Sequence, residues 1–149
     1  MNALTMWLVL GNAAATWALV GLIWTIQVVH YPLFAAVGAE QFVAYERSHQ
    51  SRITLIVAPL MGIELVTAAL LIAYPPSGIA SWTLWLGAAL VVAVWLSTAL
   101  VQVPQHELLG RGLDPRVVNK LVATNWIRTI AWTARGGIML WVLARMLDK

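Results

Sequence analysis

The sequence predicts an all-α, polytopic membrane protein that folds as an antiparallel bundle of four transmembrane helices. Of its 149 residues, 61% are hydrophobic and only 10% are charged. The mean hydropathy of +0.81 is well above that of ordinary soluble domains. Four apolar stretches also approach the length of about 20 residues that a helix needs to cross the hydrocarbon core. The lipid bilayer is therefore the first partner that we expect.

The four predicted spans belong to a single domain, residues 1–149, and cover roughly residues 4–29, 53–73, 82–103 and 126–143. We expect the first three to end at Pro32, Pro75 and Pro104, because proline cannot continue the backbone hydrogen-bond ladder. The connection of residues 74–81 is short and predicts a hairpin of spans two and three. Within span two, Pro59 should bend the helix.

The two other connections are longer. Residues 38–52 mix apolar and charged side chains, which suits an interfacial helix leading into the second span. Ahead of the fourth span, Asp114 is a predicted N-cap with Pro115 at the first helical position. The fourth helix should therefore begin before its apolar part does.

The basic residues predict the orientation of the chain in the cell membrane. Six of them flank the side of the two long connections: Arg47, Arg52, Arg111, Arg116, Lys120 and Arg128. Only two flank the opposite side, Arg145 and Lys149, where four tryptophans suit the lipid interface: Trp7, Trp82, Trp85 and Trp141. Since cytoplasmic loops are rich in Lys and Arg, we expect the long connections in the cytoplasm and both termini outside.

The composition also excludes some kinds of site and partner. The sequence contains no cysteine, so disulfides and thiolate metal sites are ruled out. The formal net charge is +3, but the nine Lys and Arg residues border apolar runs instead of lining one face. We therefore expect no nucleic-acid partner.

Two ionisable residues lie deep within the predicted spans, where an unpaired charge is costly. At about 1.5 Å per helical residue, Glu64 and Arg135 lie at similar depths, which predicts an ion pair between the second and fourth helices. This pair is either a structural staple or a site for a substrate or a proton. On the fourth helix, Asn125, Arg128 and Trp132 share a face with Arg135, and that face should point inward.

All three histidines, His30, His49 and His106, lie at the predicted cytoplasmic ends of spans. These ends meet in an antiparallel bundle, where polar residues of the third and fourth helices join them: Gln102, Asn125 and Arg128. Each imidazole could simply hydrogen-bond water near the headgroups. Alternatively, two or three of them bind a metal together with Glu40, Glu46 or Glu107. The expected cofactor is thus either none or a histidine-ligated metal.

Four tryptophans lie inside the spans instead of at their ends: Trp17, Trp24, Trp95 and Trp132. Ordinary helix packing explains such residues, and a pocket for a flat lipophilic small molecule is the alternative.

Two motifs of the second half carry a resemblance to a known family. They are Val101-Gln102-Val103-Pro104-Gln105-His106-Glu107-Leu108 and Asn125-Trp126-Ile127-Arg128-Thr129. They resemble motifs of the anthrone-oxygenase-like family of small four-helix membrane proteins, which carry an Asn-Val-Pro stretch after the third helix and Trp-Asn-x-x-Arg-Thr at the start of the fourth. Pro104, Asn125, Arg128 and Thr129 match that pattern, whereas Gln102, His106 and Thr124 depart from it.

The resemblance implies a four-span fold and, from the named members of the family, an oxygenase or related oxidoreductase that converts anthrones to anthraquinones. A lipophilic phenol would then lose a proton to His106 or His49 and react as a carbanion with dioxygen, while Arg128 and Asn125 stabilise its anionic oxygen. Two other classes stay open. One is a small-molecule or ion binding or transport component, which at this size suggests a homodimer. The other is a non-catalytic accessory membrane subunit.

Overall fold

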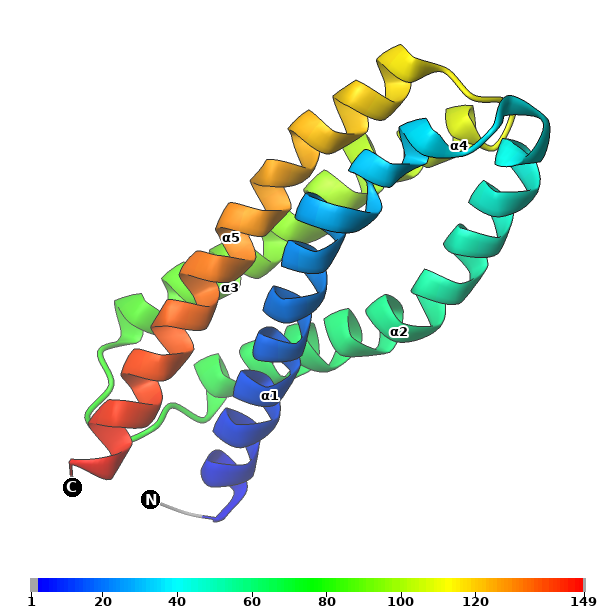
Figure 1. Ribbon diagram of the computed structural model, residues 1–149. Helices are drawn as coiled ribbons and strands as arrows, with labels where there is room; N and C mark the ends of the chain where they lie inside the picture. Colours follow the sequence, from blue (N-terminus) through cyan, green and yellow to red (C-terminus); the bar gives the residue numbers. More distant parts are fainter. Residues whose placement is uncertain (1–2, 149) are drawn as a thin grey trace.

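The computed structural model describes residues 3–148, and throughout that range the only regular structure is helical. Four long rods make up the bundle (Figure 1). In chain order the helices are α1 (Ala3–Thr25), η1 (Ile26–His30), η2 (Pro32–Ala36), α2 (Ala39–Ala73), α3 (Ser81–Ser97), η3 (Thr98–Gln102), α4 (Val103–Leu109) and α5 (Pro115–Leu147). The first rod joins α1, η1 and η2, and the third joins α3, η3 and α4.

The rods are arranged as an antiparallel bundle in which α1 packs on α2 and α5, and α3 packs on α5 and α2. The two ends of the chain lie at the same end of the bundle (Figure 1). The expected hairpin is present: α2 ends at Ala73, α3 begins at Ser81, and Gly78 in the turn adopts a φ of 78°. This conformation is one that glycine adopts without steric cost. The all-α prediction with four helices is thus confirmed.

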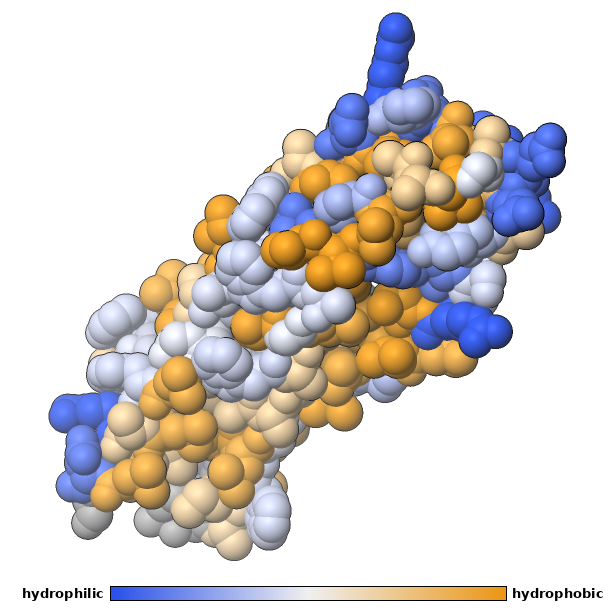
Figure 2. Space-filling view, viewed as in Figure 1, coloured by the Kyte–Doolittle hydropathy of each residue, from blue (hydrophilic) through white to orange (hydrophobic). Residues whose placement is uncertain are grey.

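Three rods are long and apolar enough to cross a membrane: Ala3–Ala36, Ala39–Ala73 and Ser81–Leu109. Within the described residues, α5 does not meet this standard of length and hydropathy. The expectation of four membrane-spanning helices is therefore confirmed for three rods. The reason is that α5 carries Arg128 and Arg135 within its apolar part, both of them buried in the bundle. On the face shown in Figure 2, hydrophobic side chains are common, and the most hydrophilic ones lie mainly toward the two ends of the bundle. Lys149, which entered the charge count, lies outside the described residues.

The first and third rods do not stop at Pro32 and Pro104, contrary to the sequence prediction. Each rod instead passes through a single π-helical turn that ends two residues before the proline, at His30 and Gln102. The backbone N–H of Tyr31 donates to the Ile26 carbonyl over 3.0 Å, and that of Val103 donates to the Thr98 carbonyl. The wider turn accommodates a residue that brings no N–H, so the helical path continues beyond it.

The remaining boundaries depend on local capping and packing. Asp114 caps α5 as predicted, its side chain accepting a hydrogen bond from the Arg116 backbone N–H over 2.8 Å. The segment before span two is helical and runs into the span as expected, because α2 is unbroken from Ala39 through Pro59 to Ala73. Figure 1 shows that α2 is bent, as a proline inside a helix predicts.

The core consists of two apolar clusters with a polar layer between them. One cluster, nearer the long connections, includes Leu19, Ile23, Phe34 and Trp132. The other, nearer the termini, includes Val9, Leu71 and Met139. The polar layer contains four buried side chains: Asn12, Thr16, Glu64 and Arg135.

Candidate functional site

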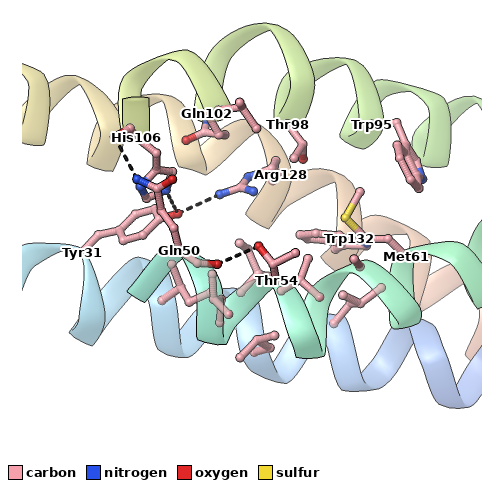
Figure 3. A pocket seen from close by; sticks show the side chains of 18 residues that line it. Tyr31, Gln50, Thr54, Met61, Trp95, Thr98, Gln102, His106, Arg128 and Trp132 are labelled. Carbon is pink, nitrogen blue, oxygen red and sulfur yellow. Dashed lines mark hydrogen bonds between the residues drawn. The ribbon is translucent and has the colours of Figure 1, made fainter. Parts of the chain in front are cut away.

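A cavity of about 270 Å³ lies inside the half of the bundle that carries the long connections. Six large side chains form much of its apolar wall: Leu19, Ile23, Val57, Met61, Trp95 and Trp132. Its polar residues are Tyr31, Gln50, Thr54, Thr98, Gln102, His106 and Arg128. Figure 3 shows Tyr31, His106 and Arg128 together at one end, with Trp95, Met61 and Trp132 toward the other. A mostly apolar pocket with a few convergent polar groups is typical of small-molecule sites.

The cavity opens sideways, between α2 and the third rod. Thr54 and Ala58 of α2 and Trp95 and Val103 of the third rod line it and are also exposed on the molecular surface. The surface around this opening is apolar, with Leu55, Ile56 and Leu96 largely exposed. An apolar molecule could therefore reach the cavity without crossing a charged surface.

A chain of three side chains leads from the cavity into the protein. The carboxylate of Glu46, which is fully buried, accepts from His106 Nδ1 over 2.6 Å. His106 Nε2 lies 2.8 Å from the Tyr31 hydroxyl. Because the carboxylate requires the proton on Nδ1, Nε2 is left as an acceptor and Tyr31 donates to it. Glu46 thus orients the imidazole as a base toward the cavity.

Arg128 completes this end of the cavity from the opposite side. Its Nη2 donates to the Tyr31 hydroxyl oxygen over 3.3 Å, and its Nε donates to Asn125 Oδ1 over 2.9 Å. The side chain is only 6% exposed. The described residues form two ion pairs, Glu46–His106 and Glu64–Arg135, and Arg128 takes part in neither. A buried guanidinium without a carboxylate partner favours binding of an anionic oxygen beside Tyr31.

Asn125 holds Arg128 in place and does not line the described cavity wall. Its amide donates to Gln27 Oε1 over 2.8 Å, which leaves its oxygen to accept from the guanidinium. Gln27, on the π turn η1, is itself held by Thr129, whose hydroxyl donates to it over 3.3 Å. These contacts favour a positioning role for Asn125, and its expected catalytic role stays a prediction.

Several buried polar atoms of the third rod lack partners within the described structure, and two of them belong to the cavity wall: Thr98 Oγ1 and Gln102 Oε1. Both residues line the cavity, and both belong to the π turn η3. Gln102 Nε2 donates to Thr124 over 3.3 Å, so this amide has one satisfied end and one free end. Buried polar groups are usually paired, so a hydroxyl or a water in the cavity is a natural partner for them.

The predicted ion pair between Glu64 and Arg135 is present, with Arg135 Nε donating to Glu64 Oε1 over 2.8 Å. Thr16 donates to the same oxygen over 2.8 Å, and Trp132 Nε1 donates to Oε2 over 3.0 Å. Arg135 Nη2 also donates to Asn12 over 2.7 Å. Neither charged residue lines the described cavity. Because both carboxylate oxygens of Glu64 are hydrogen-bonded, the geometry favours a structural role for this pair over a substrate or proton site.

No protein-family model, curated protein or solved structure matches this chain.

The three histidines converge as predicted, although only His106 lines the described cavity. The rings of His49 and His106 are 5.5 Å apart, and His30 Nε2 lies 2.8 Å from His49 Nδ1. Two nitrogens on one tetrahedral zinc would lie about 3.3 Å apart, since each bond is about 2.0–2.1 Å long. Across residues 3–148 no group of three or more candidate ligands is arranged to bind a metal. Glu40 and Glu107, offered as further ligands, are exposed.

The sequence analysis missed Tyr31 as a site residue and treated Glu46 only as a candidate metal ligand. One signal for Glu46 was present: it stands three residues before His49, so both lie on one face of α2. Tyr31 carried no such signal, because its direction depends on the π turn before it. Phe34 also contributes, packing against Tyr31 and His49 with ring centroids 5.4 and 5.2 Å away.

Proposed function

We propose that all four rods cross the cell membrane, with the long connections in the cytoplasm and both termini outside. The three apolar rods support the crossing. The burial of Asn125, Arg128, Thr129 and Arg135 inside the bundle supports including the fourth rod. The excess of basic residues around the long connections supports the orientation. In this placement the sideways opening of the cavity faces lipid.

We propose further that the protein is a membrane enzyme that removes a proton from a lipophilic small molecule. The observation that carries this proposal is the chain from Glu46 through His106 to the Tyr31 hydroxyl at the cavity wall. A carboxylate–imidazole pair whose second nitrogen accepts from a hydroxyl at the cavity wall is the arrangement of a general base. Arg128, which lacks a carboxylate partner in the described structure, stabilises the negative charge that the reaction leaves on the substrate oxygen.

In the proton step, Tyr31 passes its hydroxyl proton to His106 Nε2 and takes a proton from the substrate. The substrate becomes an enolate or phenolate, and Glu46 stabilises the imidazolium through Nδ1. The total charge is unchanged, because the substrate becomes an anion while His106 becomes a cation. The Tyr31 hydroxyl ends as it began, so it serves as a carrier between substrate and base.

The resemblance to the anthrone-oxygenase-like family suggests an oxidation after the proton step. An electron-rich anthrone carbanion reacts with dioxygen at the carbon that lost the proton. One oxygen atom stays on that carbon as the new carbonyl, and the other leaves as water with two protons, the same number that the carbon lost. The anthrone is oxidised to the anthraquinone, and dioxygen is the oxidant. Atoms and electrons balance in this step without a metal.

The experiment uses detergent-purified protein and 1,8-dihydroxyanthrone. Without oxygen, the coloured enolate should form faster than in detergent alone, and admitting oxygen should then yield the anthraquinone. We expect Glu46→Gln to slow enolate formation by about 10²- to 10⁴-fold. Glu107→Gln, which changes an exposed carboxylate next to His106, serves as the matched control.

Two outcomes separate the parts of the proposal. If the wild-type protein forms enolate no faster than detergent alone, proton removal from this substrate class is wrong. If the enolate forms but oxygen yields no anthraquinone above the protein-free rate, the proposed proton removal is supported and the oxygenase assignment is wrong.

A further inference from the structure

Two histidines lie behind the proposed base, out of contact with the described cavity. His49 is buried beside His106, with ring centroids 5.5 Å apart, and His30 lies beyond it, with its ring centroid 4.5 Å from that of His49. His30 is half-buried, so it connects the buried pair with the outside of the protein. Nothing in the proton step needs these two side chains, yet the fold gathers them on one side of Glu46.

The buried polar atoms between Glu46 and His49 are incompletely paired. Oε1 of Glu46 accepts from His106 and from Gln50, whereas Oε2 has no partner among the described residues. Nδ1 of His49 is 2.8 Å from His30 Nε2. Nε2 of His49 has no partner among the described residues. Glu46 and His49 are one turn apart on the same face of α2. The unpaired carboxylate oxygen and the unpaired imidazole nitrogen do not bond each other directly, and one water between them would pair both.

We propose that His49 and His30 carry the abstracted proton from Glu46 to the outside of the bundle. The inference rests on the proposed proton removal and adds an exit path for that proton. The path runs from Tyr31 through His106, Glu46 and His49 to His30. It explains why the chain places three histidines together although only one of them reaches the cavity.

The proton moves along this path by hops between neighbouring atoms. The His106 imidazolium gives its Nδ1 proton to Glu46 Oε1. The protonated carboxyl then rotates about its Cγ–Cδ bond until this O–H points to His49, and it passes the proton through one water to His49 Nε2. His49 then releases its Nδ1 proton to His30 Nε2, and His30 releases its Nδ1 proton to water. One proton enters and one leaves, and no electrons move. Each imidazole afterwards holds its proton on the other nitrogen and resets by exchanging tautomers, since both tautomers fit the 2.8 Å contact between His30 and His49.

The test tracks the proton separately from the substrate. Detergent-purified protein in weak buffer and without oxygen is mixed with 1,8-dihydroxyanthrone and a pH-indicator dye in a stopped-flow instrument. Enolate colour reports proton removal, and the dye reports arrival of the proton in solution. In the wild type we expect the two signals to rise together.

The variants His49→Gln and His30→Gln keep a polar side chain but cannot pass a proton. We expect the first enolate to form at close to the wild-type rate in both, while proton release falls by about tenfold or more. Added imidazole should restore release in His30→Gln, because His30 is accessible from outside. A purely structural role would not respond to imidazole. Arg47→Gln, an exposed change on the same helix, is the matched control and should behave as wild type.

Three results would overturn the relay. Proton release that keeps pace with enolate in both variants would mean that the proton leaves by another path. Loss of enolate formation in a His49→Gln protein with wild-type melting behaviour would make His49 part of the base. If the wild-type protein formed no enolate, the proposed function would be wrong, and the relay with it. This failure is distinguishable from the other two because it is seen in the wild-type protein alone.

Discussion

Gly87 of α3 leaves the space that the guanidinium of Arg135 occupies. A Cβ at position 87 would lie 2.7 Å from Arg135 Nη1, closer than real side chains approach. Arg135 is thus enclosed by α3 on one side and by its partners Glu64 and Asn12 on the other. The polar layer therefore ties all four rods together at one level of the bundle.

The first prediction concerns this glycine. We expect Gly87→Ala to displace Arg135 from Glu64 and to lower the free energy of unfolding by about 1–3 kcal/mol, as overpacking in a tight core does. Gly62→Ala is the control, because a Cβ there meets nothing within 4 Å and alanine favours the helix. The measurement is the melting temperature in detergent. Equal melting temperatures for the two variants would contradict the close approach.

A second prediction concerns the ion pair itself. Glu64→Gln leaves the Arg135 charge buried without a carboxylate, so we expect a loss of about 3–5 kcal/mol in the free energy of unfolding. The double variant Glu64→Leu with Arg135→Leu removes both charges and should be less destabilised than Glu64→Gln. Thermal unfolding in the same detergent compares them with Glu107→Gln, an exposed change. A double variant less stable than the single would argue against mutual compensation of the charges.

The third prediction separates a reactive tyrosine from a packing tyrosine. Tyr31→Phe removes the hydroxyl between His106 and Arg128, so enolate formation should fall by about 10²- to 10⁴-fold. Tyr45→Phe is the control, because Tyr45 packs near the same cluster, with its ring 5.6 Å from that of Phe34, and lies outside the cavity lining described. Stopped-flow spectroscopy without oxygen measures both. Wild-type rates in Tyr31→Phe would show that His106 acts on the substrate without a carrier.

The features that the sequence could predict are those with a simple physical cost. Apolar runs need lipid or a core, and a charge inside such a run needs a partner, which is why the bundle and the Glu64–Arg135 pair could be anticipated. The N-cap at Asp114 depends on local hydrogen bonding alone. None of these features depends on the exact rotation of a helix about its axis.

The site depends on that rotation, and its prediction was therefore incomplete. Counting residues at 100° per position assumes an unbroken α-helix, whereas each π turn adds one residue and rotates the rest of the helix by about 100°. The turn η1 thereby brings Tyr31 to the cavity and Gln27 to Asn125. The stripe on α5 pointed inward as expected, but only Arg128 and Trp132 of its four predicted residues reach the described cavity.

The fourth prediction uses the unpaired hydroxyl at the cavity wall. Thr98→Val keeps the shape of the side chain and removes Oγ1, so stability should be unchanged or slightly higher. Binding of 1,8-dihydroxyanthrone should weaken by about tenfold, the equivalent of about 1.4 kcal/mol for one lost hydrogen bond. Thr25→Val, whose hydroxyl donates to the Gly21 carbonyl, is the control. Unchanged affinity in Thr98→Val would mean that water alone occupies this position.

The last prediction concerns the way into the cavity. Ala58 is exposed on α2 and lines the cavity where it opens toward the third rod, so a phenylalanine there should narrow the opening. We expect Ala58→Phe to slow association of 1,8-dihydroxyanthrone by about tenfold, because access limits the rate at which a preformed site is filled. Ala69→Phe places the same ring on an exposed position of the same helix outside the described lining, and it should associate like wild type. Quenching of tryptophan fluorescence in a stopped-flow experiment reports the rate, since Trp95 and Trp132 line the cavity. If both variants bind at the wild-type rate, the ligand reaches the cavity by a route other than the gap between α2 and the third rod.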